Sequence, residues 1–169
     1  VCSSDLAETM CNMLSKDGES FSVPLKVAKM SSLVKTMCDD EAEAGDVQEF
    51  PMSNVSTEIL SKVIEYMKRM DSDPMPEIEK PLRSNDITQI CPEWYSNFVK
   101  VDQEVLFELI LAANYMELNT LLDLTCASVT CMIKGHTPEE IRETFKLTVD
   151  FTPEEEQQIR LENKWCEEA

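Results

Sequence analysis

Glycine and histidine are scarce in this chain, which has three glycines and one histidine among 169 residues. Loops that cradle phosphate groups need closely spaced glycines, so the sequence contains no such loop. The single histidine, His136, falls in a predicted loop beside a helix start, where a surface role is favoured over a catalytic one. The sequence therefore gives no support to a phosphate-cradling enzyme or to a histidine-dependent one.

Basic residues are also few, since 15 Lys and Arg oppose 33 Asp and Glu and give a formal net charge of -18. This charge repels nucleic-acid backbones and anionic lipids, so we expect neither nucleic acid nor a membrane as a partner. A basic protein surface would be attracted instead. The longest apolar run, 109–113, is too short to span a bilayer. The first residues have neither a basic nor an apolar region, so we expect no signal peptide.

No Cys-x-x-Cys motif occurs among the seven cysteines. An odd number without paired spacing is untypical of a secreted disulfide scaffold or of a zinc site. We therefore expect reduced thiols, no metal and no cofactor. The many carboxylates lie in runs, which are usually solvated faces. These features predict a cytoplasmic and nuclear protein that has no catalytic residues.

The N-terminal half shows alternating and then helical apolar patterns. Cys11, Met13, Phe21 and Val23 alternate with polar residues on either side of a turn at 16–18, which predicts a β-hairpin. The same kinds of signal predict two short helices at 25–37, an acidic loop at 39–46, an edge strand at 47–51, a helix that starts after an N-cap at Ser56, and a mobile, proline-rich acidic loop at 71–86.

Helical patterns dominate the C-terminal half. We expect helices at 93–99, at 103–116 after an N-cap at Asp102, and at 118–134 before Gly135. Thr137 and Thr152 each begin the pattern Thr-Pro-Glu-Glu, a capping box with proline at the first helical position. These two boxes predict further helices at 138–146 and 153–165.

The predicted helix at 103–116 is apolar around nearly its whole circumference and so needs cover on every side. Either the chain's own core encloses it, or a partner covers the second side. The residues from 138 onward have few apolar side chains among many acidic ones, and two short helices so poor in core residues cannot stabilise each other alone. They either pack back on the domain or dock against a partner's helix.

Several sequence runs are distinctive: VDQ at 101–103, LFELILAANY at 106–115, LLD at 121–123, MIKG at 132–135, TPEEIR at 137–142, FT at 151–152 and ENKWCEE at 162–168. The N-terminal half adds DG at 17–18, KTM at 35–37, NV at 54–55 and KVI at 62–64. Together these runs resemble the Skp adaptor family of SCF ubiquitin ligases. The resemblance extends from about residue 10 to the end and is densest beyond 99.

The resemblance implies an α/β fold of the α+β type. A BTB/POZ domain at 10–134, with a small mixed sheet flanked by helices, would follow a flexible tail at 1–9 and precede F-box-binding helices at 135–169. The chain would be a non-catalytic adaptor that joins a cullin scaffold to F-box substrate receptors and so supports substrate ubiquitination. The alternative is a self-assembling BTB scaffold that uses its exposed apolar face for homodimerisation.

The resemblance also implies where each partner binds. Cullin would dock where Asn114 and Tyr115 lie, and the F-box helices would pack on the other side. Carried over by position, the F-box-binding residues are Leu106, Phe107, Ile110, Leu122, Cys126, Val129, Ile141, Phe145, Leu147, Ile159, Asn163 and Trp165. We expect at most a weak homodimer in the absence of an F-box partner.

Overall fold

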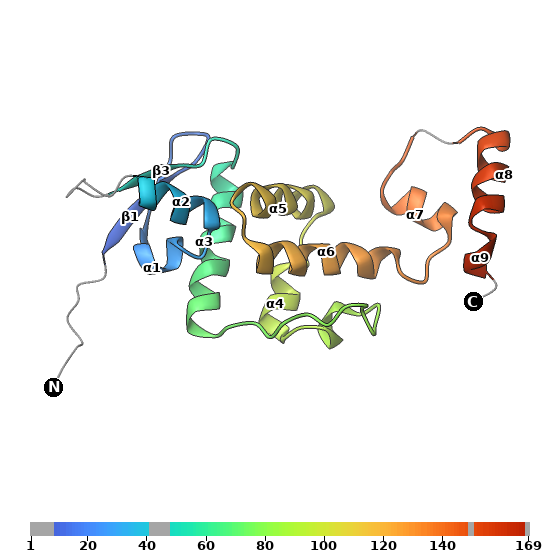
Figure 1. Cartoon of the computed structure of the whole chain (residues 1–169), viewed down its shortest axis with the longest axis horizontal. Helices are drawn as coiled ribbons and strands as arrows, with labels where there is room; N and C mark the ends of the chain where they lie inside the picture. The colour runs from blue at the N-terminus through green and yellow to red at the C-terminus, as the bar shows by residue number, and fades with distance from the viewer. Residues whose placement is uncertain (1–8, 41–47, 149–150, 168–169) are drawn as a thin grey trace. The chain divides into compact units, whose positions relative to one another are not determined.

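The computed structural model describes residues 9–40, 48–148 and 151–167. Its contacts divide the chain into two compact units, 1–131 and 132–169, whose elements are labelled in Figure 1. The predicted tail at 1–9 and the predicted acidic loop at 39–46 lie almost entirely outside the described residues. In the described ranges, no helix is long and apolar enough to cross a membrane.

A three-stranded sheet opens the first unit. Strand β1 (Met10–Leu14) pairs antiparallel with β2 (Ser20–Pro24) and parallel with β3 (Glu49–Pro51), in the order β2-β1-β3. Cys11 and Met13 on β1 are fully buried, because alternate side chains of a strand face the same side. The hairpin and the edge strand are therefore confirmed, and this small mixed sheet among helices confirms the predicted fold class.

Helices α1 (Leu25–Ala28), α2 (Ser32–Asp40) and α3 (Thr57–Ser72) belong to the same unit and lie beside the sheet (Figure 1). The pattern at 25–37 thus forms two short helices, as predicted. The apolar stripe of α3 faces the core and consists of Ile59, Leu60, Val63, Ile64, Tyr66 and Met67.

The start of α3 is capped from the β-hairpin. Ser56 occupies the N-cap position, but its Oγ makes no capping bond and donates to Glu108 Oε2 at 3.4 Å instead. The Thr57 N–H and the Thr57 hydroxyl both donate to Asp17 Oδ2 at 3.0 Å. The backbone bond, followed by the hydroxyl bond, holds the pKa of the Asp17 carboxyl below its ordinary value. The N-cap position predicted at Ser56 is confirmed, but the capping hydrogen bonds go to a carboxylate from a distant turn and not to the Ser56 side chain.

Residues 73–86 connect α3 to a 3-10 helix, η1 (Ile87–Gln89), and are called the arm below. The predicted loop at 71–86 thus begins later than expected, because α3 continues to Ser72. Ile78 in the arm is only 5% exposed, and the Tyr95 hydroxyl donates to the carbonyl of Asp73. The arm is therefore packed into the first unit by an apolar side chain and by a hydrogen bond.

Three more helices complete the first unit, namely α4 (Glu93–Phe98), α5 (Gln103–Tyr115) and α6 (Asn119–Ile133), whose last residues lie in the second unit. All three were expected from the sequence and are confirmed. Asp102 occupies the N-cap position of α5, as predicted, but its side chain accepts no capping hydrogen bond. The buried side chains of α5 all face one side: Leu106, Leu109, Ala112 and Ala113.

The second unit contains the helices α7 (Pro138–Thr144), α8 (Pro153–Glu162) and α9 (Lys164–Glu167). Both predicted capping boxes are confirmed. The Glu140 N–H donates to Thr137 Oγ1 at 3.3 Å and Glu140 Oε2 accepts from the Thr137 N–H at 2.8 Å, and Thr152 and Glu155 repeat the arrangement. Neither α7 nor α8 buries a side chain. Local signals at the helix starts, rather than buried side chains, therefore define α7 and α8.

Candidate partner-binding surfaces

Helix α5 leaves one side in solvent. Phe107, Leu111 and Asn114 are spaced four and three residues apart, so they follow one side of the helix. Phe107 is 39% exposed, Leu111 is 68% exposed, and Asn114 is exposed as well. We call these three residues the α5 stripe. Large apolar side chains exposed side by side are typical of a surface that binds another protein.

The predicted cullin-binding pair lies at the C-terminal end of α5, where Asn114 is exposed and Tyr115 is half-buried. Phe107, predicted to bind F-box helices on the other side, lies on the α5 stripe together with Asn114. Ile110 is half-buried and Leu106 is fully buried, so Leu106 supports the surface from beneath and cannot touch a partner in this conformation. The assignment of each residue to a partner stays a prediction.

A small hollow of about 170 Å³ adjoins the α5 stripe. Lys16 of the hairpin turn, Asn54 and Ser56 before α3, and Glu108 and Leu111 of α5 contribute to its lining. Pockets for small molecules usually measure roughly 300–1,000 Å³, so this hollow suits a single side chain of a partner rather than a cofactor. Sequence reasoning missed Leu111, although its spacing from Phe107 and Asn114 along an over-apolar helix could have identified it.

A second exposed stripe lies on α6. Leu122, Cys126 and Val129 are spaced four and three residues apart along one side of this helix. Cys126 is exposed, and Leu122 and Val129 are half-buried. The structure thus brings together three predicted F-box-binding residues, which we call the α6 stripe. Asp123 borders this stripe and is paired with Lys80 of the arm at 2.7 Å.

The other predicted F-box-binding residues belong to the second unit. Ile141 and Phe145 are half-buried. Leu147 is 57% exposed, Ile159 38% and Trp165 70%. Because a tryptophan side chain carries a large apolar area, its exposure in a unit with so little core is typical of a residue that anchors a partner.

Two further apolar residues of the second unit were left out of the predicted site. Phe151 is 56% exposed and Leu161 is 66% exposed. Their apolar character in an acidic segment was the available signal. Asn163, which was included, uses its side-chain amide within its own helix, because Nδ2 donates to the Ile159 carbonyl at 2.8 Å. The side-chain oxygen of Asn163, Oδ1, is the part of the amide that could accept a hydrogen bond from a partner.

Cysteine and histidine side chains are present among the described residues of both units. No group of three His, Cys, Asp or Glu residues there could hold a metal ion, and none of the six described cysteines forms a disulfide. Burial raises the pKa of the Cys11 thiol to about 11, so this thiol is protonated and unreactive at neutral pH. His136 Nδ1 lies 3.4 Å from Glu140 Oε2. The Thr137 N–H and then His136 hold the pKa of that carboxyl below its ordinary value.

The small mixed sheet, its flanking helices and the stripes on α5 and α6 define a protein-binding domain of the POZ type. Residues 9–71 match the tetramerisation domain of the Skp1 family and residues 119–166 match its dimerisation domain. The chain belongs to the Skp1 family, which confirms the resemblance noted in its sequence.

Two relatives illustrate this membership. Over 166 residues the chain is 46% identical to the S-phase kinase-associated protein 1 homolog of Tetrahymena thermophila, with 98% of both chains covered. Over 162 residues it is 44% identical to the E3 ubiquitin ligase complex SCF subunit sconC of Arthroderma otae, with 96% of this chain and 97% of that one covered. The likeness thus extends over the whole fold.

Proposed function

We propose that this chain is an adaptor subunit of an SCF-type ubiquitin ligase and joins a cullin to F-box proteins. The observation that carries the proposal is the presence of two separate apolar stripes, on α5 and on α6, in a member of the Skp1 family. A protein that holds two others together needs two such surfaces, and it needs no reactive group of its own. The proposed adaptor is therefore non-catalytic.

The two surfaces receive different partners in this proposal. Asn114 and Tyr115, with Leu111 beside them, would bind the cullin. Leu122, Cys126 and Val129 would bind the F-box, together with the exposed apolar residues of the second unit. Reduced cysteines fit a place of action in the cytoplasm and nucleus, which fluorescence microscopy of the tagged chain would test.

A reconstitution experiment tests the adaptor role. The purified chain is mixed with a recombinant F-box domain and a recombinant N-terminal cullin fragment, and the mixture is analysed by size-exclusion chromatography with light scattering. We expect a complex that contains one copy of each. The variant with Asn114→Ala and Tyr115→Ala should lose the cullin fragment and keep the F-box domain. Competition between the two partners, or binding of neither, would contradict the proposal.

A second candidate function is self-assembly, and the 68% exposure of Leu111 favours it. Apolar side chains this exposed can also pair two copies of one chain. Sedimentation of the pure protein at micromolar concentration separates the two functions. A tight dimer that the F-box domain cannot dissociate would favour the scaffold over the adaptor.

A further inference from the structure

The arm reaches α6 through one ion pair. The arm and residues 119–131 of α6 belong to the first unit, and the arm passes beside this part of α6 (Figure 1). Lys80 Nζ donates to Asp123 Oδ1 at 2.7 Å, and this hydrogen bond raises the pKa of Lys80 above its ordinary value. Asp123 is the single charged residue in the sequence of α6. The charge next to the α6 stripe is therefore balanced by a residue that comes from a different segment.

Asp123 stands at the border of the α6 stripe. It follows Leu122 directly, and it is three residues from Cys126, so the two side chains are neighbours on the helix surface. The Asp123 side chain is 43% exposed and that of Lys80 is 66% exposed. A partner helix that covered Leu122 and Cys126 would therefore also take water away from this pair.

Removal of water changes the energetic contribution of the ion pair between Lys80 and Asp123. In the free protein both groups are well hydrated, and an exposed pair of this kind adds little to stability. Under a docked partner, the local dielectric constant falls and the attraction between the two charges strengthens. An Asp123 carboxylate without Lys80 would lose its hydration there and gain no compensating interaction. The pair should therefore affect binding far more than folding.

We propose that Lys80 is a positioning residue of the F-box-binding surface: it neutralises Asp123 beside the α6 stripe and so makes the arm part of that surface. The inference rests on the proposed function, because it assumes that an F-box helix covers the stripe. It adds a residue from outside the helices, which no apolar pattern in the sequence would have identified. Lys80 acts through Asp123 and need not touch the partner.

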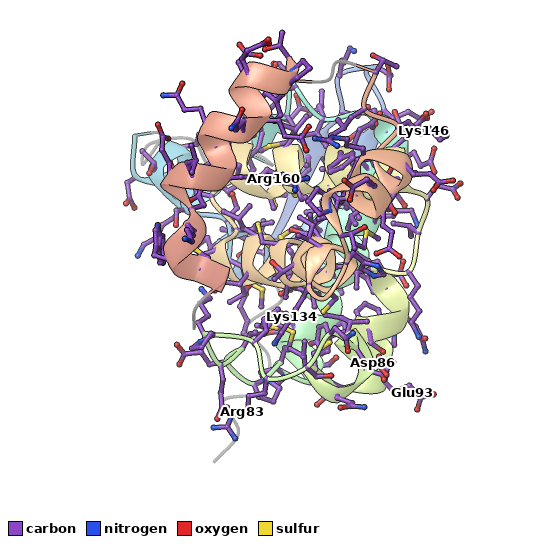
Figure 2. All side chains as sticks on the ribbon, turned by 90° about the vertical axis from the view of Figure 1, so that its right-hand side faces the viewer. Arg83, Asp86, Glu93, Lys134, Lys146 and Arg160 are labelled. Carbon is purple, nitrogen blue, oxygen red and sulfur yellow. The ribbon has the colours of Figure 1, made fainter. Side chains whose placement is uncertain are left out.

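Four variants test this proposal. Lys80→Gln leaves the Asp123 carboxylate unpaired, and Asp123→Asn removes the carboxylate itself. The double variant places two neutral side chains of similar size at the same positions. Arg83→Gln is the matched control, because Arg83 also lies in the arm and also forms an ion pair, but with Glu79 of the arm itself at 2.8 Å. Its side chain extends from the arm into solvent (Figure 2).

The affinity and the dissociation rate for a recombinant F-box domain are measured by surface plasmon resonance. We expect Lys80→Gln to weaken binding by about five- to tenfold, mainly through faster dissociation, because a partly desolvated charge has lost its partner. Asp123→Asn should weaken binding less, because the long Lys80 side chain can turn towards solvent. The double variant should recover to within about twofold of the wild type, which indicates coupling between the two positions.

Other outcomes would overturn the proposal. Lys80→Gln binding as tightly as the wild type would exclude any role for the arm. A double variant that stays as weak as Lys80→Gln would mean that Lys80 contacts the F-box domain directly. A lower melting temperature that accounts for the loss would reduce Lys80 to a folding role, so thermal denaturation of all four variants is included. If the wild type itself fails to bind the F-box domain, the proposed function falls together with the inference.

Discussion

The two units of this chain use the same local signals but differ in what they bury. In the first unit, large side chains such as Tyr66, Leu109 and Met116 are almost completely buried. In the second unit, α7 and α8 bury none, and Trp165 is 70% exposed. Capping can define where a helix starts, but short helices need an apolar surface to persist. We therefore expect the first unit to be stable alone and the second to depend on a bound partner.

The largest expected effect comes from the core of the first unit. Leu109→Ala should lower the free energy of unfolding by roughly 2–5 kcal/mol, because it leaves a cavity where a fully buried side chain was. Urea denaturation followed by circular dichroism measures this loss. The control is Leu161→Ala in the second unit, where the leucine is 66% exposed, and its effect should stay within about 0.5 kcal/mol. Comparable losses in both variants would refute the contrast between the units.

A smaller effect, on affinity rather than stability, is expected from the second unit. Trp165→Ala should weaken binding of a recombinant F-box domain by at least about 2 kcal/mol, because large aromatic side chains carry much of the energy at interface centres. Isothermal titration calorimetry measures this change. Binding of the cullin fragment and the urea midpoint should both be preserved. Unchanged F-box affinity would show that the exposed tryptophan is not the anchor, and would count against the tail as a docking segment.

The features that could be predicted from the sequence are those that local signals encode. The capping boxes at Thr137 and Thr152 lie within single turns, and the alternation around Gly18 defines a hairpin whose register follows from the turn. Prediction failed where the interaction partner is distant in sequence. Asp17 caps α3 from forty residues away, and Lys80 reaches Asp123 across forty-three. The periodic spacing of apolar residues, from which helices and strands are predicted, contains no information about hydrogen bonds between residues so far apart in the sequence.

The predicted site shows the same limit. The many apolar residues of the helix at 103–116 predicted that this helix carries a binding surface. They could not predict which of its side chains face the core and which face solvent. Leu106 and Leu111 have the same chemistry, yet one is fully buried and the other is 68% exposed. Only the position of the other helices decides between them. The exposure of Trp165, by contrast, could be anticipated, because the tail has too few apolar residues to enclose it.

The smallest expected effect concerns the Schellman motif, which ends one helix in each unit. After α5, the Leu118 N–H donates to the Ala113 carbonyl at 2.9 Å and Glu117 takes a positive φ of 54°. After α7, the Leu147 N–H donates to the Arg142 carbonyl at 2.9 Å and Lys146 has a φ of 50°. Both are Schellman motifs with a non-glycine residue in the left-handed position, where glycine is strongly preferred.

Glycine at either position relieves the left-handed strain, and part of that gain is lost because glycine is more flexible in the unfolded chain. Glu117→Gly should therefore raise the free energy of unfolding by about 0.5–1 kcal/mol. Lys146→Gly should leave the urea midpoint unchanged and alter only hydrogen exchange at the end of α7, because neither α7 nor α8 buries a side chain whose exposure on unfolding it could oppose. Equal gains from both substitutions would mean that the two units unfold as one, and that the second unit is ordered without a partner.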